Sequence, residues 1–229
     1  MSDVKRGNPG NPTTRPYRSA LREENARRTR AAIAAAAREL FLTRGYGGTS
    51  LADVAALAQV ARPTVSATFG SKPALLRQVL DEALAGDDEP VPVAQRPWFT
   101  PVWDATTPAE VLTAYAQVCT LIGGRAAQIF ETTRRAADDT PEVAELWQTL
   151  LRNRRAGARM VVERARTLGQ LRQGDDLHRA VDILWIFNDP ALYDSLVLHC
   201  GWPVEDFQRW LAERMCDALL PADQRSPRS

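Results

Sequence analysis

The stretch that decides the fold spans residues 49–73 and reads TSLADVAALAQVARPTVSATFGSKP. Its first half predicts a short helix that begins at Leu51, because Ser50 can accept a hydrogen bond from the Asp53 amide and a carboxylate suits the positive end of a helix. The apolar side of this helix follows helical spacing and consists of Leu51, Val54, Ala55 and Ala58. We therefore expect one face of the helix to be buried.

A second short helix is predicted after a tight turn at residues 59–61. Pro63 marks its first turn, where the amide hydrogen that proline lacks would have no partner. Val65 and Phe69, four residues apart, predict its buried side. The side chains that point away from the core are then Arg62, Thr64, Ser66, Ala67 and Thr68. Two helices joined by a short turn, with small polar side chains exposed on the second, have the geometry that enters a DNA major groove.

Longer helices are predicted on both sides of this stretch. The preceding helix runs from residue 21 or 25 to residue 43, and Gly45 just beyond its end is a C-terminal stop. Three arginines stand near its beginning, where positive charge is unfavourable for the helix dipole, and so indicate an external anion: Arg27, Arg28 and Arg30. The following helix has Ser71 as its cap and runs to about residue 85, so residues 21–85 predict a compact four-helix unit.

The net charge of +1 hides an asymmetry along the chain. Residues 1–80 hold 13 lysines and arginines against 5 acids, and the remainder holds 16 against 23. A basic first third on an acidic body is typical of a polyanion-binding module joined to a domain that does not bind polyanions. A solvated basic face without a partner is the alternative.

A pattern without gaps runs from residue 29 to residue 76 and consists of Thr29, Arg30, Ile33, Ala36, Ala37, Leu40, Phe41, Arg44, Gly45, Tyr46, Thr49, Ser50, Leu51, Asp53, Val54, Ala55, Ala58, Val60, Pro63, Thr64, Val65, Phe69, Gly70, Ser71, Lys72, Leu75 and Leu76. This pattern resembles the DNA-binding domain of the TetR family of bacterial transcriptional regulators. The resemblance implies a dimeric repressor that a small-molecule effector releases from its double-stranded DNA operator.

The chain departs from the family pattern at two places. Gln59 stands in the turn where the family often has glycine, and Ser66 and Ala67 stand where a phosphate-binding tyrosine and a histidine are common. The usual aromatic phosphate contact is therefore missing from the second helix. Base preference cannot be transferred from relatives.

The predicted DNA contacts fall into two groups. Base edges in the groove are assigned to the exposed side of the second helix, namely Arg62, Thr64, Ser66, Ala67 and Thr68. Phosphates are assigned to flanking residues, which position the protein without reading sequence: Arg27, Arg28, Arg30, Tyr46, Thr49, Ser50 and Lys72. We expect the hydroxyl of Tyr46 to point outward.

Three segments are predicted to be irregular. Residues 1–20 are rich in Pro, Gly and Asn and indicate a flexible basic arm, which either samples DNA or is an idle tail. Residues 86–107 combine prolines with Trp98, Phe99 and Trp103 and indicate a linker or lid that packs back onto the body, because aromatic side chains favour burial. Residues 221–229 indicate a disordered tail.

The remaining residues, 108–220, read as helices throughout, and no strand-like alternation occurs anywhere in the chain. The helices are predicted at about 108–122, stopped by Gly123 and Gly124, and then at 125–137, 141–168, from 176 to 187, 190–199 and 204–220. We thus expect an all-α protein, with an N-terminal helix-turn-helix domain of three to four helices and a C-terminal helical ligand-binding and dimerisation domain.

The last two helices are the expected homodimer surface, as they are in the TetR family. Their large apolar residues exceed what a terminal helix pair needs to cap its own core: Leu192, Leu196, Trp202, Phe207, Trp210 and Leu211. Packing within one subunit is the alternative interpretation. A dimer would let two recognition helices read half-sites about 34 Å apart.

A small-molecule pocket is expected among the body helices, since helix bundles place cavities between helices and this family commonly does so. The candidate lining residues are Tyr115, Cys119, Phe130, Trp147, Arg154, Trp185 and Asn188. Each of them could instead be ordinary core packing. The identity of the effector cannot be read from the sequence.

Enzymatic, metal-binding and membrane functions are not indicated. His178 and His199 lack a partner at metal-ligand spacing, no glycine-rich phosphate loop occurs, and no cofactor is expected. No apolar run is long enough for a signal peptide or a membrane helix, so a cytoplasmic protein is expected. Three widely spaced cysteines predict buried free thiols. Two alternatives stay open: a regulator gated by a protein partner, and a helical ligand- or partner-binding protein with a degenerate DNA-binding module.

Overall fold

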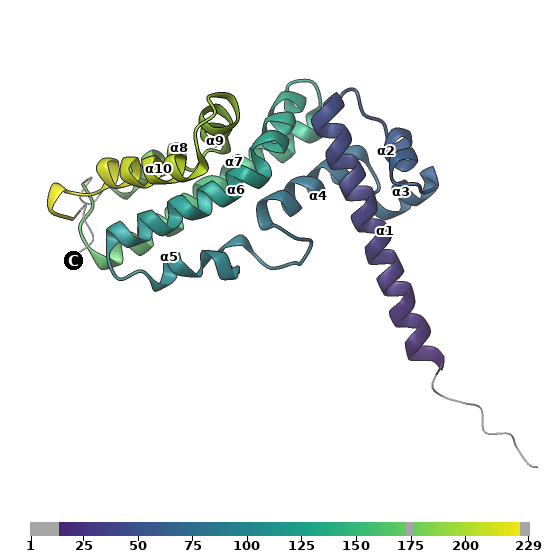
Figure 1. The fold of residues 1–229 in the computed structure, drawn as a ribbon, viewed down its shortest axis with the longest axis horizontal. Helices are drawn as coiled ribbons and strands as arrows, with labels where there is room; N and C mark the ends of the chain where they lie inside the picture. The colour runs from purple at the N-terminus through teal and green to yellow at the C-terminus, as the bar shows by residue number, and fades with distance from the viewer. Residues whose placement is uncertain (1–13, 173–175, 225–229) are drawn as a thin grey trace, which may run out of the picture.

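The computed structural model describes residues 14–172 and 176–224, and within these ranges the chain is helical without strands. Figure 1 shows an elongated body with a smaller group of helices at the end opposite the C-terminus. The N-terminal helices are α1 (Thr14–Arg44), α2 (Leu51–Leu57), α3 (Arg62–Phe69) and α4 (Lys72–Ala85). The body consists of α5 (Thr100–Asp104), α6 (Pro108–Ala137), α7 (Pro141–Leu168), α8 (Leu177–Phe187), α9 (Pro190–Tyr193), η3 (Asp194–His199) and α10 (Val204–Leu219). The all-α prediction is confirmed.

Helix α1 begins at Thr14, seven residues before the earliest predicted start. Residues 14–20 are therefore helical, and that part of the predicted flexible arm is wrong. The proline in this segment, Pro16, lies in the first turn, where a missing amide hydrogen breaks no intrahelical bond. Residues 1–13 of the predicted arm lie outside the described residues.

The helix-turn-helix forms as its capping residues predict. Ser50 caps α2 through a reciprocal pair of bonds: its hydroxyl accepts from the Asp53 amide at 3.1 Å, and the Asp53 carboxylate accepts from the Ser50 amide at 2.9 Å. Pro63 lies in the first turn of α3, and Ser71 caps α4 by accepting from the Ala74 amide. The predicted starts of all three helices are confirmed.

Helix α6 continues through Gly123 and Gly124, so the predicted stop between two shorter helices is wrong. Gly123 is buried against the side chain of Tyr193, and a Cβ atom at this glycine would lie 2.7 Å from that side chain. The glycine pair therefore serves the close approach of α9 to α6, and packing offsets the low helix propensity of glycine.

The last helices also differ in detail from the prediction. The helix expected over residues 190–199 is α9 followed by a π-helical turn, η3, in which the Cys200 amide bonds to the Ser195 carbonyl. Residues Ala222–Gln224 form a short 3-10 turn, η4, so this part of the predicted disordered tail is ordered. Residues 225–229 lie outside the described part of the chain.

The buried residues form two cores that meet along α6 and α7. One core fills the C-terminal half of the body between α6, α7, α8 and α10. The other unites α1–α4 with the far ends of α6 and α7, through residues such as Ile129, Val143 and Leu146. The N-terminal helices are therefore not packed as a separate unit, because part of their core is supplied by the body.

Residues 86–107 pack onto the body, as their aromatic content predicts. Phe99 and Val102 belong to the body core, and the Trp103 indole donates to the Ala94 carbonyl. Arg96 is 4% exposed and holds the segment together by donating to the carbonyls of Val91 and Glu89 and to the Asp87 carboxylate. We call residues 86–99 the strap.

Candidate DNA-binding surface and ligand cavity

Helix α3 presents a small exposed face. Val65 and Phe69 are buried, as predicted, while Arg62, Ser66 and Ala67 are exposed. Thr64 and Thr68 are half-buried, and the Thr68 hydroxyl donates to the Thr64 carbonyl at 2.7 Å. The five predicted base-contacting residues thus lie on one short helix, with three of them fully available to a partner.

The turn between α2 and α3 contains a residue in an unusual conformation. Gln59 has a φ of +56°, in the left-handed region that disfavours residues with a Cβ atom. The chain is held in this turn by backbone bonds from Gln59 to Ala56 and from Val60 to Ala55. The turn keeps the left-handed geometry that glycine adopts without strain.

The corner between α1 and α2 is built around Lys72. Its ammonium group donates to the carbonyls of Tyr46 and Thr49 at 2.9 and 3.0 Å, and it lies 4.0 Å from the centre of the Tyr46 ring. Burial lowers the pKa of Lys72. This lysine, predicted to contact a phosphate, therefore also ties α4 to the loop before α2.

Two predicted phosphate contacts are buried in this corner. Thr49 is 2% exposed, and its hydroxyl shares its hydrogen between the carbonyls of Leu40 and Gly45. The Tyr46 ring packs against Phe41, and the residue as a whole is only 7% exposed. Burial, and then the Glu142 carboxylate, raise the pKa of Tyr46. Both side chains anchor the loop, and the buried Thr49 hydroxyl, engaged with two carbonyls, is not available to a phosphate. Ser50 is exposed, but its hydroxyl is engaged in the α2 cap.

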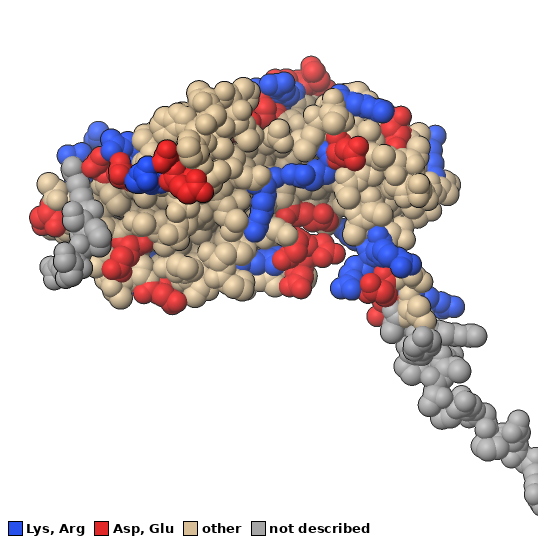
Figure 2. All heavy atoms as spheres, in the orientation of Figure 1, with Lys and Arg blue, Asp and Glu red and all other residues tan. Residues whose placement is uncertain are grey.

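The three arginines of α1 do not form one cluster. Arg30 donates to the Gln78 side chain at 2.6 Å and lies over the Phe69 ring at 4.6 Å, so it joins α1 to α4 and α3. Arg27 and Arg28 are exposed, contact Glu24 and Asn25 one turn earlier, and line a groove between α1, α4 and α6. Figure 2 shows basic side chains on α1 near α2 and α3. It also shows a patch of acidic side chains where the N-terminal helices meet the body.

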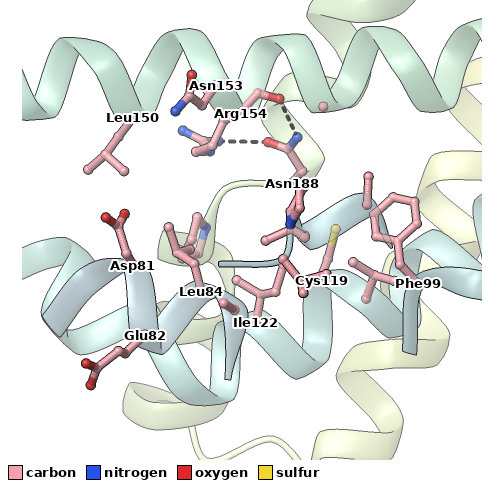
Figure 3. A pocket seen from close by; sticks show the side chains of 18 of the residues that line it. Asp81, Glu82, Leu84, Phe99, Cys119, Ile122, Leu150, Asn153, Arg154 and Asn188 are labelled. Carbon is pink, nitrogen blue, oxygen red and sulfur yellow. Dashed lines mark hydrogen bonds between the residues drawn. The ribbon is translucent and has the colours of Figure 1, made fainter. Parts of the chain in front are cut away.

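A cavity of about 800 Å³ lies between α4, α6, α7 and the strap. Its lining is mainly apolar, with Leu84, Phe99, Ile122, Leu150 and Met160 among the contributing residues. A volume of this size is typical of small-molecule sites. Figure 3 shows Asp81 and Leu84 of α4 facing Leu150 and Arg154 of α7 across the space.

A chain of hydrogen bonds forms the polar wall of the cavity. Arg154 donates to the Asn188 side-chain oxygen at 3.1 Å, and the Asn188 amide donates to the Tyr115 hydroxyl at 2.9 Å. Arg154 also pairs with Asp189 at 3.0 Å. Burial raises the pKa of Tyr115 and raises that of Cys119 to about 12, so both groups are neutral at ordinary pH.

Five of the predicted pocket residues line this one cavity: Tyr115, Cys119, Phe130, Arg154 and Asn188. The other two do not line it. Trp147 packs edge-on against Phe130 with ring centres 4.8 Å apart, and Trp185 lies 5.6 Å from the Arg154 guanidinium. Each of these two tryptophans therefore packs against a residue that lines the cavity.

The residues that α4 and the strap contribute to the cavity were not predicted. From α4 these are Gln78, Asp81, Glu82, Leu84 and Ala85, and from the strap they include Val91, Val93 and Ala94. Leu84 extends the apolar pattern of α4 beyond its core-facing residues, and it is the one sequence signal that points to this surface.

Residues 33–79 match the family model described as bacterial regulatory proteins, tetR family. Residues 33–79 are therefore similar to the N-terminal domain of the TetR family. No curated protein sequence matches the chain. The matched residues run from α1 to α4 and include the entire helix-turn-helix.

Solved structures of transcriptional regulators share the fold of this chain across most of its length. A regulator from Mesorhizobium loti is 15% identical with a TM-score of 0.63, covering 86% of this chain and 98% of its own. A regulator from Saccharomonospora viridis in complex with choline is 16% identical with a TM-score of 0.64, covering 84% and 97%. The SmeT–triclosan complex is 20% identical with a TM-score of 0.66, covering 88% and 96%.

The predicted dimer surface on the last helices is only partly available. Phe207 and Leu211 are 2% and 0% exposed within the subunit, so their prediction as interface residues is wrong. They fill the body core because α10 packs on α6 and α8. The other four, Leu192, Leu196, Trp202 and Trp210, are half-buried. Large apolar side chains that the prediction missed are exposed on α8, η3 and α10: Ile186, Leu198 and Val204.

Neither a metal centre nor a membrane segment is found in the part of the chain that the structure describes. Its residues include no group of three or more His, Cys, Asp or Glu that could hold a metal ion. None of the helices within residues 14–172 and 176–224 has the length and apolarity to cross a membrane. Among the cysteines, Cys216 is buried and Cys119 is half-buried, but Cys200 is exposed, which corrects the prediction of three buried thiols.

Proposed function

We propose that the chain is a sequence-specific DNA-binding repressor that acts as a homodimer in the cytoplasm and leaves its operator when a small molecule occupies the cavity. This proposal is based on the exposed face of α3. Arg62, Ser66 and Ala67 stand free on a helix whose opposite side is locked into the N-terminal core by Val65 and Phe69. A rigid helix with a small, partly basic exposed face suits insertion into a major groove.

Helix α4 supplies the coupling between DNA and ligand. Leu75, Leu76 and Leu80 on α4 belong to the core shared with α1–α3, whereas Leu84 and Ala85 line the cavity. A ligand that requires a different position of α4 would therefore also favour a different position of α3. Its effect on DNA affinity is set by its differential affinity for the two arrangements.

The similar structures solved with small molecules support the effector part of the proposal. Choline and triclosan are named with two proteins that share the fold of this chain. The homodimer is supported by the exposed apolar residues Ile186, Leu198 and Val204, which lie on α8, η3 and α10. Exposed apolar surface of this kind is typical of a protein interface.

Selection of bound sequences from a random DNA pool tests the proposal. We expect enrichment of a two-fold symmetric site with half-sites about one helical turn apart, because a dimer places two α3 helices on one face of the duplex. The absence of any enriched sequence would contradict the proposal and favour a helical ligand- or partner-binding protein with a degenerate DNA-binding module.

A further inference from the structure

The exposed face of α3 has an apolar residue at its centre. A helix turns by about 100° per residue, so residues two places before and after Ala67 point about 160° away from it on either side. These two residues are Val65 and Phe69, the buried residues of the helix. The exposed Ala67 methyl group therefore lies at the middle of the outer face, opposite the N-terminal core.

Pro63 extends this apolar centre by one turn of the helix. It precedes Ala67 by four residues, so the two lie within about 40° of each other around the helix axis. Both are exposed. Ser66 and Thr68 lie about 100° to either side of Ala67, and the Thr68 hydroxyl is already used in a bond to the Thr64 carbonyl. We call Pro63 and Ala67 the apolar strip.

The strip lies on a helix that is fixed in place and can approach a partner closely. Val65 is fully buried, and the Arg30 guanidinium of α1 covers the Phe69 ring at 4.6 Å from its centre. The side chains next to the strip, Thr64 and Ser66, are short. The helix backbone can therefore come close to the floor of a DNA groove without moving its own side chains.

Thymine is the base whose major-groove edge suits this strip. It carries a 5-methyl group there, whereas guanine, cytosine and adenine present hydrogen-bond donors and acceptors. An apolar strip against a donor or acceptor removes water from that group and replaces no hydrogen bond, which costs free energy. Against a thymine methyl group, apolar surface on both sides leaves water, which is favourable.

We propose that Pro63 and Ala67 read the 5-methyl groups of thymines, so that each operator half-site has thymine where the apolar strip faces the base edges. This inference rests on the proposed function of α3 as the recognition helix. It adds the base that two residues of this helix select and the atoms through which they select it.

Deoxyuridine tests the inference, because it differs from thymidine only by the missing 5-methyl group. The DNA is the sequence enriched from the random pool, with one thymine position at a time replaced in both half-sites, and affinity is measured by fluorescence anisotropy. We expect replacement at one or two positions to weaken binding about fourfold per methyl group removed from the interface. If no replacement weakens binding, the inference is overturned.

Variants of Ala67 assign the contact. The measured quantity is the ratio of affinities for thymine DNA and deoxyuridine DNA, which general destabilisation does not change. Ala67→Gly should bring this ratio to about one at a sensitive position, because the methyl group on the protein side is gone. Ala32→Gly, at an exposed position of α1, has a similar cost in helix propensity and should keep the parental ratio. An unchanged ratio in Ala67→Gly, or an equal loss in Ala32→Gly, overturns the role of Ala67.

Pro63→Ala provides an independent variant that keeps a good helix former in the first turn. Loss of the ring should lower the ratio by about twofold or more at a sensitive position. Pro101→Ala is the matched control, since Pro101 is exposed and is the second residue of α5, as Pro63 is of α3. A ratio that stays at the parental value in Pro63→Ala overturns the role of Pro63.

The outcomes also separate this inference from the proposed function. An enriched two-fold symmetric site whose thymines all tolerate deoxyuridine would overturn the reading of methyl groups and leave the DNA-binding function intact. A pool from which no sequence is enriched would overturn both.

Discussion

The side chain of Tyr193 packs directly against Gly123 in the middle of α6. A Cβ atom at Gly123 would lie 2.7 Å from the Cβ and Cγ atoms of Tyr193, closer than such atoms approach in folded proteins. Tyr193 is buried at this contact and also packs edge-on against Phe207 of α10. The contact therefore sets the distance of α9 from α6 beside the polar wall of the cavity.

We predict that Gly123→Ala lowers the free energy of unfolding by about 1–3 kcal/mol, because overpacking at Tyr193 outweighs the gain in helix propensity. Gly157→Ala on α7 is the matched control, since a Cβ atom there would meet nothing within 4 Å. This control should raise stability by up to about 1 kcal/mol. Thermal and urea unfolding of both variants check the prediction, which fails if the two changes have the same sign.

Substitutions of Gln59 are predicted to change the stability of the helix-turn-helix. Its φ of +56° costs a residue with a Cβ atom more than glycine, so Gln59→Gly should raise stability by about 1 kcal/mol. Gln59→Val should lower it, because a β-branched residue tolerates this conformation least. Urea unfolding gives both values. A Gln59→Gly variant that is less stable than the parent would show that the turn is not strained.

Much of the fold could be predicted because its signals are local. Caps such as Ser50 and Thr107, and prolines such as Pro63 and Pro141, start helices by interactions within one turn. Gly123 misled the prediction because its role depends on a residue 70 positions later in the chain, Tyr193. A glycine that permits close packing and a glycine that ends a helix look the same in sequence.

In the candidate site, too, some residues could be predicted from local sequence signals and others could not. The outward residues of α3 follow from helical spacing, so their exposure was predictable. The burial of Thr49 and Tyr46 was not, since both are fixed by contacts between α1 and the following loop that helical periodicity does not report. The same holds for α4, whose role in the cavity depends on the strap folding back over it.

Lys72 is predicted to have two separable roles. Lys72→Met should lower stability by about 1–3 kcal/mol, because the carbonyls of Tyr46 and Thr49 lose a charged donor. It should also reduce the slope of log affinity for DNA against log salt by about one unit if the ammonium neutralises a phosphate, as we propose. Anisotropy titrations over a salt series, well below the unfolding temperature, measure the slope. An unchanged slope would limit Lys72 to its structural role.

Acid sensitivity should arise in part from Glu131 on α6. Hydrogen bonds from Arg134 and Arg135 lower its pKa to about 2. A lowered acid pKa stabilises the fold above the unfolded value and loses that contribution as pH falls toward the folded value. Glu131→Gln should therefore cost up to about 1 kcal/mol at neutral pH, a small figure because the arginines are solvent-exposed.

The pH dependence separates this contribution from others. Unfolding curves of the parent and of Glu131→Gln should converge as pH falls from about 4.5 to about 2, because the native carboxylate becomes protonated over that range. A constant difference between the two proteins across this range would contradict the prediction.

The central claim is that α3 reads DNA through Arg62, and fluorescence anisotropy on the DNA enriched from the random pool tests it most directly. Arg62→Ala should bind this DNA at least about tenfold more weakly than the parent and should discriminate less against substituted sites. Arg152→Ala on α7 removes the same charge from another exposed position and should bind like the parent. If Arg62→Ala binds the enriched DNA as tightly as Arg152→Ala does, the account of α3 as the recognition helix is contradicted.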